Sequence, residues 1–565
     1  MKRGPLKSPV SKGSKRPKLH GDYDQYFSLN TTYYKNPITC ERANEFNNGK
    51  RKKPIDFLNG YIATQGKSDD SKTIIHWFRG DLRTHDNTGL FEAIKQFRER
   101  KDNISGQLLT IFTINEHDWR AHMDSGWKLK FMMNAVSSLG EKLSKMSIPL
   151  HVLHYNPESP SLSNSNHFAS WLKEECLNLA KGSGPVLLTA NAQYETDELY
   201  RDIKMFEQSD SSFKFKVFHD ACVIEPKLLT TGKGTQYTVF TPWYKKWAVE
   251  ATSRMQNSKT FIRELSKDPV KDEEIDFKPL QYELPSEFLS YIPEGAPELP
   301  EASEDAAFQV LSDFSSQRAH AYDKKDYLPD EGSSHLSCYI TSGLISARYI
   351  VSEAAKLTNG ALAAKDIKKN SPVQEFIREV AWRDFYKHAF CNWPFLSMDL
   401  PYSFELNEMK WSDDQEAFKK WCEGETGVPI VDAIMRKLLC TGFISNRARM
   451  ITASFLCKNL LLDYRWGERW FRKHLIDFDL ASNVGGWGFC SSTGIDAQPY
   501  FRILNMELQS KKFDPEGRYI RKWVPELKDC KDVHTFNLER NGYQSAIVDY
   551  KKSRERALAT YRQIL

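Results

Sequence analysis

The chain has 565 residues, of which 40% are hydrophobic and 27% charged. One hydrophobic core rarely serves a chain of this length, so a small module is excluded and two large domains are expected. The net charge of +5 is unevenly spread, since residues 1–53 carry 13 Lys/Arg and 4 Asp/Glu and the remainder is slightly acidic. Any nucleic-acid surface on the folded body must therefore be a local patch.

Ten cysteines are scattered along the chain without a CxxC pair. No apolar signal peptide precedes them, and no apolar run approaches the ~18 residues of a membrane span. The pattern favours a reducing compartment and predicts no metal site and no disulfide framework. We expect a monomer without a membrane partner.

Residues 1–70 are expected to form a disordered basic leader. The first 21 residues hold seven Lys/Arg, three prolines and no acid, a composition that cannot bury enough apolar surface to offset the entropy of ordering. A nuclear address around residues 15–18, a mitochondrial transit peptide and a plain solvated polymer all fit this composition. Nucleus and mitochondrion are the expected locations.

Residues 71–225 alternate strand-like and helix-like segments. Helical spacing covers residues 127–146 and 168–181, and the strand-like runs are 73–78, 108–114, 148–154, 186–190 and 213–224. This alternation predicts an α/β domain, a doubly wound parallel sheet covered on both faces. No GxGxxG follows the first strand, so the dinucleotide fingerprint is absent where it would belong.

A linker is expected over residues 226–305, whose later part is rich in proline and acids. Residues 306–527 show repeated helical periodicity, and eight of the fourteen tryptophans lie between Trp382 and Trp523. This predicts a mostly α-helical second domain with an aromatic content that exceeds ordinary packing needs. Residues 528–565 form an expected helical extension.

Glu379, Trp382, Arg383 and Tyr386 are spaced to share one face of a helix. A carboxylate beside an indole suits a flat heterocycle, because the ring stacks while the acid accepts a hydrogen bond or supplies a proton. The alternative is an amphipathic helix that presents a salt-bridged glutamate and a boundary tryptophan.

Arg449 precedes a nearly apolar run and should therefore be buried against an acid. Asp477 and Asp479 are the candidate partners, unless they are surface acids on a turn. The GSSHLS sequence at residues 332–337 predicts an N-cap and an anion site ahead of a helix from about His335, although ordinary helix capping explains it too.

Basic and aromatic residues alternate near the end of the predicted helical domain. Such a patch can follow phosphates while its aromatic rings stack on bases; a solvated charged surface is the alternative. The residues are Tyr500, Arg502, Lys511, Lys512, Phe513, Arg518, Tyr519, Arg521, Lys522 and Trp523.

Nine runs, in order from residue 76 to residue 502, resemble the photolyase/cryptochrome family, and within it the microbial class I cyclobutane-pyrimidine-dimer photolyases. They are HWFRGDLR at 76–83, NAQYE at 191–195, VFTP at 239–242, GSSHLS at 332–337, WRDF at 382–385, GVPIVDA at 427–433, NRARM at 446–450, GGW at 485–487 and TGIDAQPYFR at 493–502.

The resemblance implies that the helical domain holds FAD and receives a dimer turned out of UV-damaged DNA. The reaction it implies is light-driven, with an electron passing from excited reduced FAD to the dimer and back. Its matching dimer-pocket positions are Glu379, Trp382, Asn446 and Met450. Its matching FAD positions are Tyr322, Ser333, Ser334, His335, Leu336, Ser337, Arg383, Arg449, Asp477, Asp479 and Asn483.

Further residues carry over from the same resemblance. DNA contacts match Arg447, Lys458, Arg502 and Lys512. The outer and inner members of an electron-transfer chain match Trp411 and Trp487, while Tyr464 stands where a middle tryptophan is usual, so that Tyr464 or Trp466 is the middle carrier.

Asp197 and Glu198 match positions that hold a light-harvesting 5,10-methenyltetrahydrofolate. Ser397 and Met398 depart from the bacterial pair that helps to hold it, so a folate and a deazaflavin stay open as the second chromophore.

The alternatives to a repair enzyme are a cryptochrome-type blue-light flavoprotein without repair activity and a catalytically silent flavoprotein that binds nucleic acid. Glu379 and Asn446 argue against both, because (6-4) enzymes and animal cryptochromes usually differ at these positions. The sequence therefore predicts a deoxyribodipyrimidine photo-lyase activity.

Overall fold

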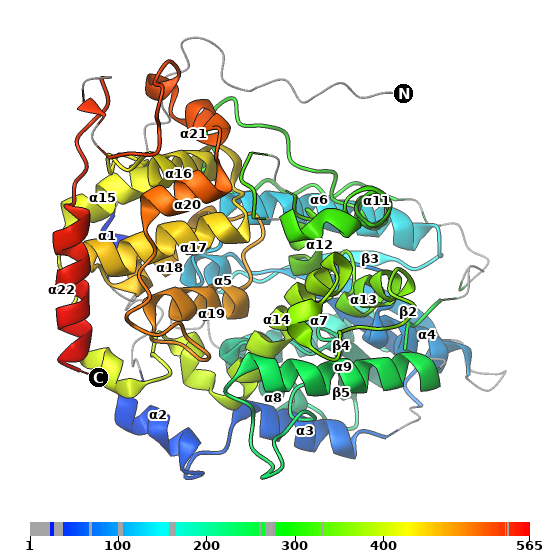
Figure 1. The fold of residues 1–565 in the computed structure, drawn as a ribbon. Helices are drawn as coiled ribbons and strands as arrows, with labels where there is room; N and C mark the ends of the chain where they lie inside the picture. Colours follow the sequence, from blue (N-terminus) through cyan, green and yellow to red (C-terminus); the bar gives the residue numbers. More distant parts are fainter. Residues whose placement is uncertain are drawn as a thin grey trace.

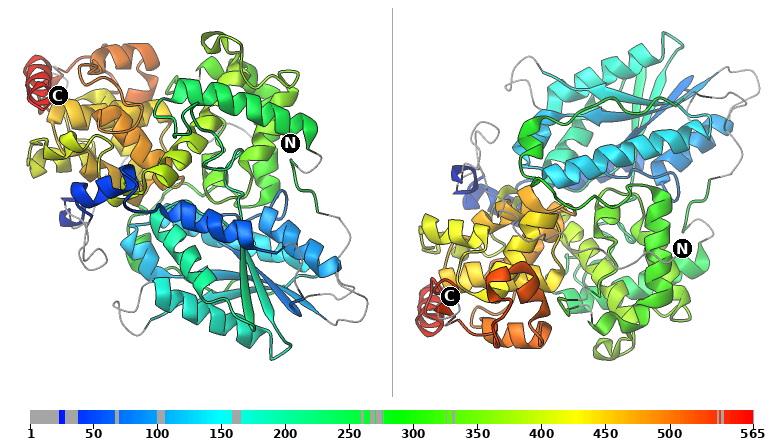
Figure 2. Two further views of the ribbon diagram at one scale, coloured as in Figure 1. Left: turned by 90° about the horizontal axis from the view of Figure 1, so that it is seen from below. Right: turned by 90° about the horizontal axis from the view of Figure 1, so that it is seen from above.

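In the computed structural model of the chain, the described residues are 23–27, 38–66, 70–99, 106–157, 165–258, 261–265, 270, 275, 277–324, 326–329, 332–536, 538–539 and 542–564. An α/β domain lies beside a larger helical domain (Figure 2). Among the described residues no helix is long and apolar enough to cross a membrane.

A five-stranded parallel sheet with the order β3-β2-β1-β4-β5 forms the α/β domain (Figure 1). Its strands are short, largely buried runs rich in β-branched residues, which suits a sheet covered on both faces. This confirms the predicted parallel sheet, although the last strand ends six residues before the predicted boundary. The strands are β1 (Thr73–Phe78), β2 (Gln107–Ile114), β3 (Leu150–His154), β4 (Val186–Asn191) and β5 (Phe213–Phe218).

Helices cover both faces of this sheet. Side chains of β1 alternate between them: Ile74 and Phe78 pack with α4 and α6, whereas Ile75 and Trp77 pack with α3, α7 and α8. The helices up to this point in the chain are α1 (Asp24–Phe27), α2 (Cys40–Asn47), α3 (Pro54–Thr64), α4 (Thr88–Arg98), α5 (Glu116–Ala121), α6 (Gly126–Ser144), α7 (Ser165–Leu179) and α8 (Thr196–Glu207).

The expected disordered leader is wrong for much of residues 23–66. Tyr26 of α1 is buried in the core of the helical domain, Phe46 of α2 in the large core shared by both domains, and Leu58 of α3 against the sheet. The composition of this segment predicted disorder because it contains few apolar side chains, but distant parts of the chain bury those that it has. The basic cluster at residues 15–18 lies outside the described residues.

The helical domain contains the remaining helices except α10, which packs on α6 of the α/β domain. Both α9 and α10 lie within the segment expected to be a linker. The helix expected from about His335 begins two residues later, at Ser337, as α12. The helices are α9 (Phe240–Asn257), α10 (Ser286–Leu289), α11 (Glu304–Gln317), α12 (Ser337–Thr341), α13 (Ala347–Lys356), α14 (Pro372–Asn392), α15 (Gln415–Glu423), α16 (Pro429–Thr441), α17 (Asn446–Ser454), α18 (Tyr464–His474), α19 (Leu480–Ser491), α20 (Met506–Phe513), α21 (Arg518–Trp523) and α22 (Tyr550–Arg562).

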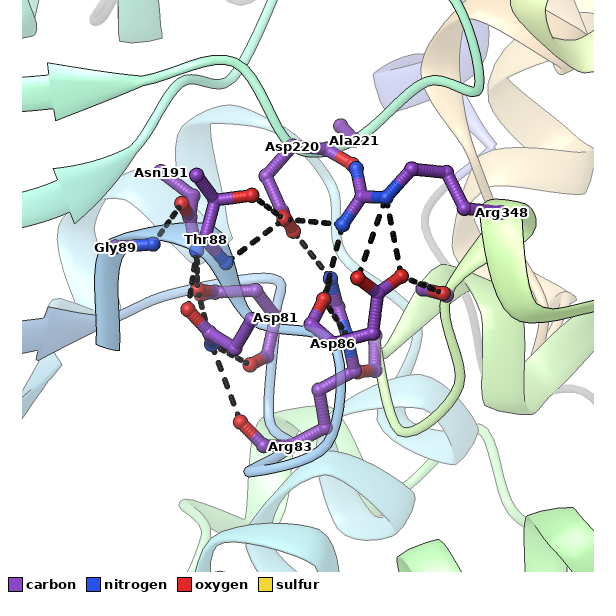
Figure 3. A network of polar contacts seen from close by, with 12 residues as sticks. Asp81, Arg83, Asp86, Thr88, Gly89, Asn191, Asp220, Ala221 and Arg348 are labelled. Carbon is purple, nitrogen blue, oxygen red and sulfur yellow. Dashed lines mark hydrogen bonds and ion pairs between the residues drawn. The ribbon is translucent and has the colours of Figure 1, made fainter. Parts of the chain in front are cut away.

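A buried charge network joins the two domains (Figure 3). Arg348, at the start of α13, donates to Asp86 (Nε to Oδ2, 3.0 Å) and to Asp220 (Nη2 to Oδ1, 2.7 Å). Arg83 also donates to Asp220. The two guanidinium groups and the two carboxylates balance in charge and are almost inaccessible to solvent, so the network fixes how the helical domain sits on the sheet.

Candidate active site

A cavity of about 300 Å³ lies in the helical domain, where α12, α14, α17 and α19 meet. The sequence builds it locally: Ser371 and Gln374 form a capping box that starts α14, and the Asp479 side chain caps α19. All eleven predicted FAD-binding residues line it, namely Tyr322, Ser333, Ser334, His335, Leu336, Ser337, Arg383, Arg449, Asp477, Asp479 and Asn483.

Ion pairs hold the charged side chains of this wall. Arg449 Nη2 donates to both carboxylate oxygens of Asp477 (2.8 and 2.7 Å), one of the two candidate partners that the sequence offered. Asp479 instead meets the Lys387 ammonium at 2.9 Å. Burial alone would raise the pKa of the Asp479 carboxyl, but Lys387 and Arg383 hold that pKa well below its usual range. The Asp479 carboxyl is therefore charged at neutral pH.

The polar end of the cavity is the serine-rich turn before α12. The residue at the N-cap of α12 is Leu336, whose side chain cannot accept a hydrogen bond. The first backbone N–H groups of this helix therefore have no capping side chain to donate to. The Ser333 hydroxyl is buried and has no hydrogen-bond partner among the described residues. Burial lowers the pKa of His335 to about 4, and Arg318 acts in the same direction. Unused donors in a buried turn suit the phosphates of a dinucleotide.

The other end of the cavity is flat and apolar. A Cβ built on Gly486 of α19 meets no atom within 4 Å, so the backbone there borders open space that a planar ring can approach. Asn483, one turn earlier, donates from Nδ2 to the backbone oxygen (3.1 Å) and Oε1 (2.8 Å) of Glu468. These two bonds fix the orientation of its amide, and the residues present fit FAD.

Three of the four predicted dimer-pocket residues, Glu379, Asn446 and Met450, line the same cavity. Trp382 does not; its ring stacks on Phe240 of α9, with centroids 3.6 Å apart and planes 7° from parallel. The sequence reasoning noted Phe240 only within a matching run and gave it no role, because its neighbour lies 142 residues away.

Comparisons with known proteins agree with this geometry. Residues 74–260 match the family model described as DNA photolyase, and residues 376–563 match that of the FAD binding domain of DNA photolyase. The chain belongs to the DNA photolyase family. It is 49% identical over 571 residues to the mitochondrial deoxyribodipyrimidine photo-lyase of Saccharomyces cerevisiae, with 100% of both chains covered.

Other photolyases and related structures are more distant. Identity is 34% to the deoxyribodipyrimidine photo-lyase of Neurospora crassa, over 94% of this chain and 89% of that protein. The crystal structure of a class III photolyase from Agrobacterium tumefaciens matches with a TM-score of 0.69 and 27% identity, over 89% and 99% of the two chains. A Synechocystis cryptochrome (TM-score 0.68, 24% identity, 88% and 100% covered) shows the shared fold.

A second cavity of this photolyase, about 430 Å³, lies between the two domains. Asp197 and Glu198 line it from α8, and Ser397 and Met398 from the helical domain. His122 Nε2 lies 3.2 Å from Asp197 Oδ2. Burial raises the pKa of Glu198 to about 7, so near neutral pH this carboxyl can either donate or accept a proton.

Lys387 connects the two cavities, a role that sequence reasoning missed. It is buried on α14 and bridges Asp479 of the first cavity and Glu195 of the second (3.3 Å). Burial alone would lower the pKa of Lys387, but the two carboxylates hold it above its usual range. The Lys387 ammonium therefore stays charged at neutral pH and keeps its ion pairs with both carboxylates.

The four predicted DNA-contact residues divide into three kinds. Arg502 and Lys512 are exposed. Arg447 is partly buried and paired with Asp326 at 2.7 Å. Lys458 is fully buried, and its ammonium donates to the Ser491 carbonyl (3.2 Å) and the Ser492 hydroxyl (2.9 Å). The prediction that Lys458 contacts DNA is therefore wrong, because residues remote in sequence, including Tyr561 of α22, cover it.

The predicted electron-transfer residues form two groups. Trp487 lines the FAD-sized cavity, and its ring contacts among the described residues are with Trp421 and Phe471 (centroids 6.1 and 5.0 Å). Trp411 and Tyr464 contact each other at 6.1 Å. Trp466 packs on Phe418 instead. No ring contact between described residues links Trp487 to Tyr464.

Proposed function

We propose that this photolyase repairs cyclobutane pyrimidine dimers in UV-damaged DNA, using FAD in the cavity of the helical domain. The observation that carries the proposal is that Glu379, Asn446 and Met450 share one cavity with all eleven candidate FAD-binding residues. When bound and reduced, FAD supplies under light the electron that splits the dimer.

The residues of the chain would bind, orient and shield the two partners. The turn at residues 333–337 and the Arg449–Asp477 pair would hold the phosphate and ribitol part of FAD, while Asn483 and Gly486 would border its ring system. Glu379 would hydrogen-bond a pyrimidine carbonyl of the dimer, and Asn446 and Met450 would position its rings. A dimer pairs poorly in the duplex, which lowers the cost of turning it out.

The direct test is to irradiate purified protein with an oligonucleotide that contains one thymine dimer and to measure restored thymine. Repair that needs both light and reduced flavin supports the proposal. A flavoprotein that absorbs blue light but restores no thymine would instead be a cryptochrome-type protein without repair activity.

Glu379→Ala should lower the yield of dimer splitting far more than the affinity for damaged DNA. A hydrogen bond to a charged group contributes about 1.5–3 kcal/mol, so losing it as charge develops on the dimer should slow splitting roughly tenfold or more. Repair per absorbed photon and the Kd for damaged DNA are the measurements.

Glu375→Ala is the matched control, because Glu375 lies one turn earlier on α14 and pairs with Arg378 at 2.7 Å. Equal repair yields in Glu379→Ala and wild type would remove Glu379 from the reaction.

The exposed cations Arg502 and Lys512 would bind backbone phosphates around the cavity. Each neutralised phosphate steepens the dependence of log K on log salt by roughly 0.9 for duplex DNA. Lys512→Ala should therefore flatten that slope by about one phosphate, whereas Lys458→Met should leave it unchanged because Lys458 is buried. The slope comes from DNA-binding titrations over a salt series, and a flatter slope in Lys458→Met would contradict the assignment.

A light-harvesting 5,10-methenyltetrahydrofolate is the proposed ligand of the cavity between the domains. A carboxyl such as Glu198, with a pKa near 7, can share a proton with the ring nitrogens and amino group of a pterin. A solved archaeal photolyase from Sulfolobus tokodaii carries two FAD molecules. Mass spectrometry of the chromophores released from purified protein distinguishes a folate, a deazaflavin and a second flavin.

We further propose that the protein acts as a monomer in mitochondria and in the nucleus. The mitochondrial relative from Saccharomyces cerevisiae supports the first location, and the basic N-terminal composition is compatible with both. Fractionation of cells that express the full chain tests the locations, and sedimentation tests the oligomeric state.

A further inference from the structure

A cluster of aromatic rings extends from the FAD-sized cavity to the N-terminal segment. Trp487 contacts Trp421 of α15, whose ring stacks on Phe418 (centroids 5.9 Å, planes 21° apart). Phe418 contacts Trp470 of α18 at 6.4 Å. Trp470 in turn stacks on Tyr23, with centroids 6.0 Å and planes 7° apart.

Tyr23 is held in this place by the short helix α1. Arg469 Nη1 donates to the Tyr26 carbonyl at 2.9 Å, and Tyr26 is buried against Trp470 and Phe418. Figure 1 shows α1 beside α15 and α18, more than 380 residues away in the sequence. Segment 23–27 therefore adds a partly exposed tyrosine to a tryptophan cluster that is otherwise largely buried.

The chemistry at Tyr23 differs from that at Tyr464. The Tyr23 hydroxyl donates to Glu423 Oε1 at 2.9 Å, whereas the Tyr464 hydroxyl pairs with the hydroxyl of Thr493. A phenol is readily oxidised only if its proton can leave at the same time, and a carboxylate accepts that proton far better than a hydroxyl does. Burial and the neighbouring acids raise the pKa of Tyr23, so the phenol stays protonated until it is oxidised.

We propose that Tyr23 is the terminal electron donor of a relay that leads from Trp487 through Trp421 and Trp470, with Glu423 as its proton acceptor. The inference rests on the proposed flavin site, because a bound oxidised flavin excited by light is the electron acceptor. Electron tunnelling falls steeply with distance, so the ring contacts of Trp487 favour Trp421 over Tyr464 as the next donor.

The steps balance as follows. One electron leaves Trp487 for the flavin, and an electron from Trp421 then reduces the oxidised Trp487. Trp470 in turn reduces Trp421 across the Phe418 ring, and Tyr23 finally reduces Trp470. The phenolic proton of Tyr23 moves to the Glu423 carboxylate, which leaves a neutral tyrosyl radical and a protonated glutamic acid. A thiol reductant in solution restores Tyr23 by supplying one hydrogen atom to its phenoxyl oxygen, and the partly exposed Glu423 carboxyl releases its proton to solvent.

The test uses the full-length protein with oxidised flavin, illuminated without DNA, and follows the tyrosyl radical by electron paramagnetic resonance. Wild-type protein should give a tyrosyl signal whose hyperfine pattern collapses when ring-deuterated tyrosine is incorporated. Tyr23→Phe should remove at least nine-tenths of this signal while keeping the ring packing. Glu423→Gln keeps a hydrogen bond but removes the base, so radical formation should slow at least tenfold. In wild type the rate of radical formation should fall in D2O because a proton moves with the electron, and this dependence on D2O should be lost in Glu423→Gln.

Tyr26→Phe is the matched control, because Tyr26 contacts the same Trp470 but has no hydrogen bond to a carboxylate among the described residues. It should keep the signal, as should Trp411→Phe, whereas Trp421→Phe should abolish it. An unchanged signal in Tyr23→Phe, or no tyrosyl signal in wild type, overturns the proposal.

Two further measurements distinguish failure of the proposed repair function from failure of the relay. Protein without bound flavin shows this in its absorption spectrum before illumination. Protein reduced chemically beforehand should repair dimers equally well in all these variants, because the repairing electron does not use the relay.

Discussion

Asp220→Asn should lower the free energy of unfolding by about 3–5 kcal/mol, the range seen when one partner of a buried ion pair is removed. Asparagine keeps the shape of the side chain, but Arg83 would lose its paired carboxylate and Arg348 would keep only that of Asp86, in a site almost without solvent. Urea unfolding at neutral pH measures the loss.

Asp210→Asn is the control, because Asp210 pairs with Lys173 at a solvent-exposed position, where an ion pair adds little to stability. If both variants lose equally little, the network between the domains does not stabilise the fold.

The pH dependence of this effect has a definite sign. Burial alone would raise the pKa of Asp220, but Arg83 and Arg348 depress it far below its usual value. A depressed carboxyl stabilises the folded state above its unfolded pKa of about 3.9 and loses that contribution as the pH falls further. The difference between wild type and Asp220→Asn should therefore be constant above about pH 5 and shrink below about pH 4.

Leu58→Ala should lower the free energy of unfolding by about 2–5 kcal/mol. Leu58 is fully buried between α3 and the sheet, so its truncation leaves a cavity as well as losing apolar burial. Phe57→Ala on the same helix is the control, since Phe57 is 40% exposed and should cost below about 1 kcal/mol.

Chain truncation extends this comparison. A chain that starts at residue 48 lacks α2 but keeps α3, whereas one that starts at residue 67 lacks both helices and should unfold at a lower temperature. Equal melting temperatures for these two truncated chains would show that α3 adds nothing to the core.

Much of the α/β domain was predictable from the sequence. Strand β4 is a largely apolar run that is buried along its whole length, which is typical of a parallel strand covered on both faces, and its predicted bounds differ from the structure by one residue. An acid partner for Arg449, either Asp477 or Asp479, was also expected because a buried guanidinium needs an acid, and the structure shows that it is Asp477. The motifs named eleven candidate FAD residues, which the fold gathers around one cavity.

The predictions that the structure contradicts, for α3 and for Lys458, fail for one physical reason. Helix α3 was expected to be disordered because its segment is basic and precedes the first strand, but Leu58 packs on a sheet formed by later residues. Lys458 was placed at the DNA surface because it matches a DNA-contact position of the family that the sequence resembles, yet Tyr561, more than 100 residues later, covers it. In both cases the environment of the side chain comes from distant parts of the chain.

The sequence by itself determined the secondary structure of the sheet and the chemical identity of the candidate site residues, because hydrophobic periodicity and short motifs are local properties. Only the tertiary structure decided that Trp382 stacks on Phe240, that Lys387 ties two cavities together, and that Tyr23 reaches Trp470. These contacts depend on how helices dock, and docking is set by the shape and charge of surfaces that no single segment contains.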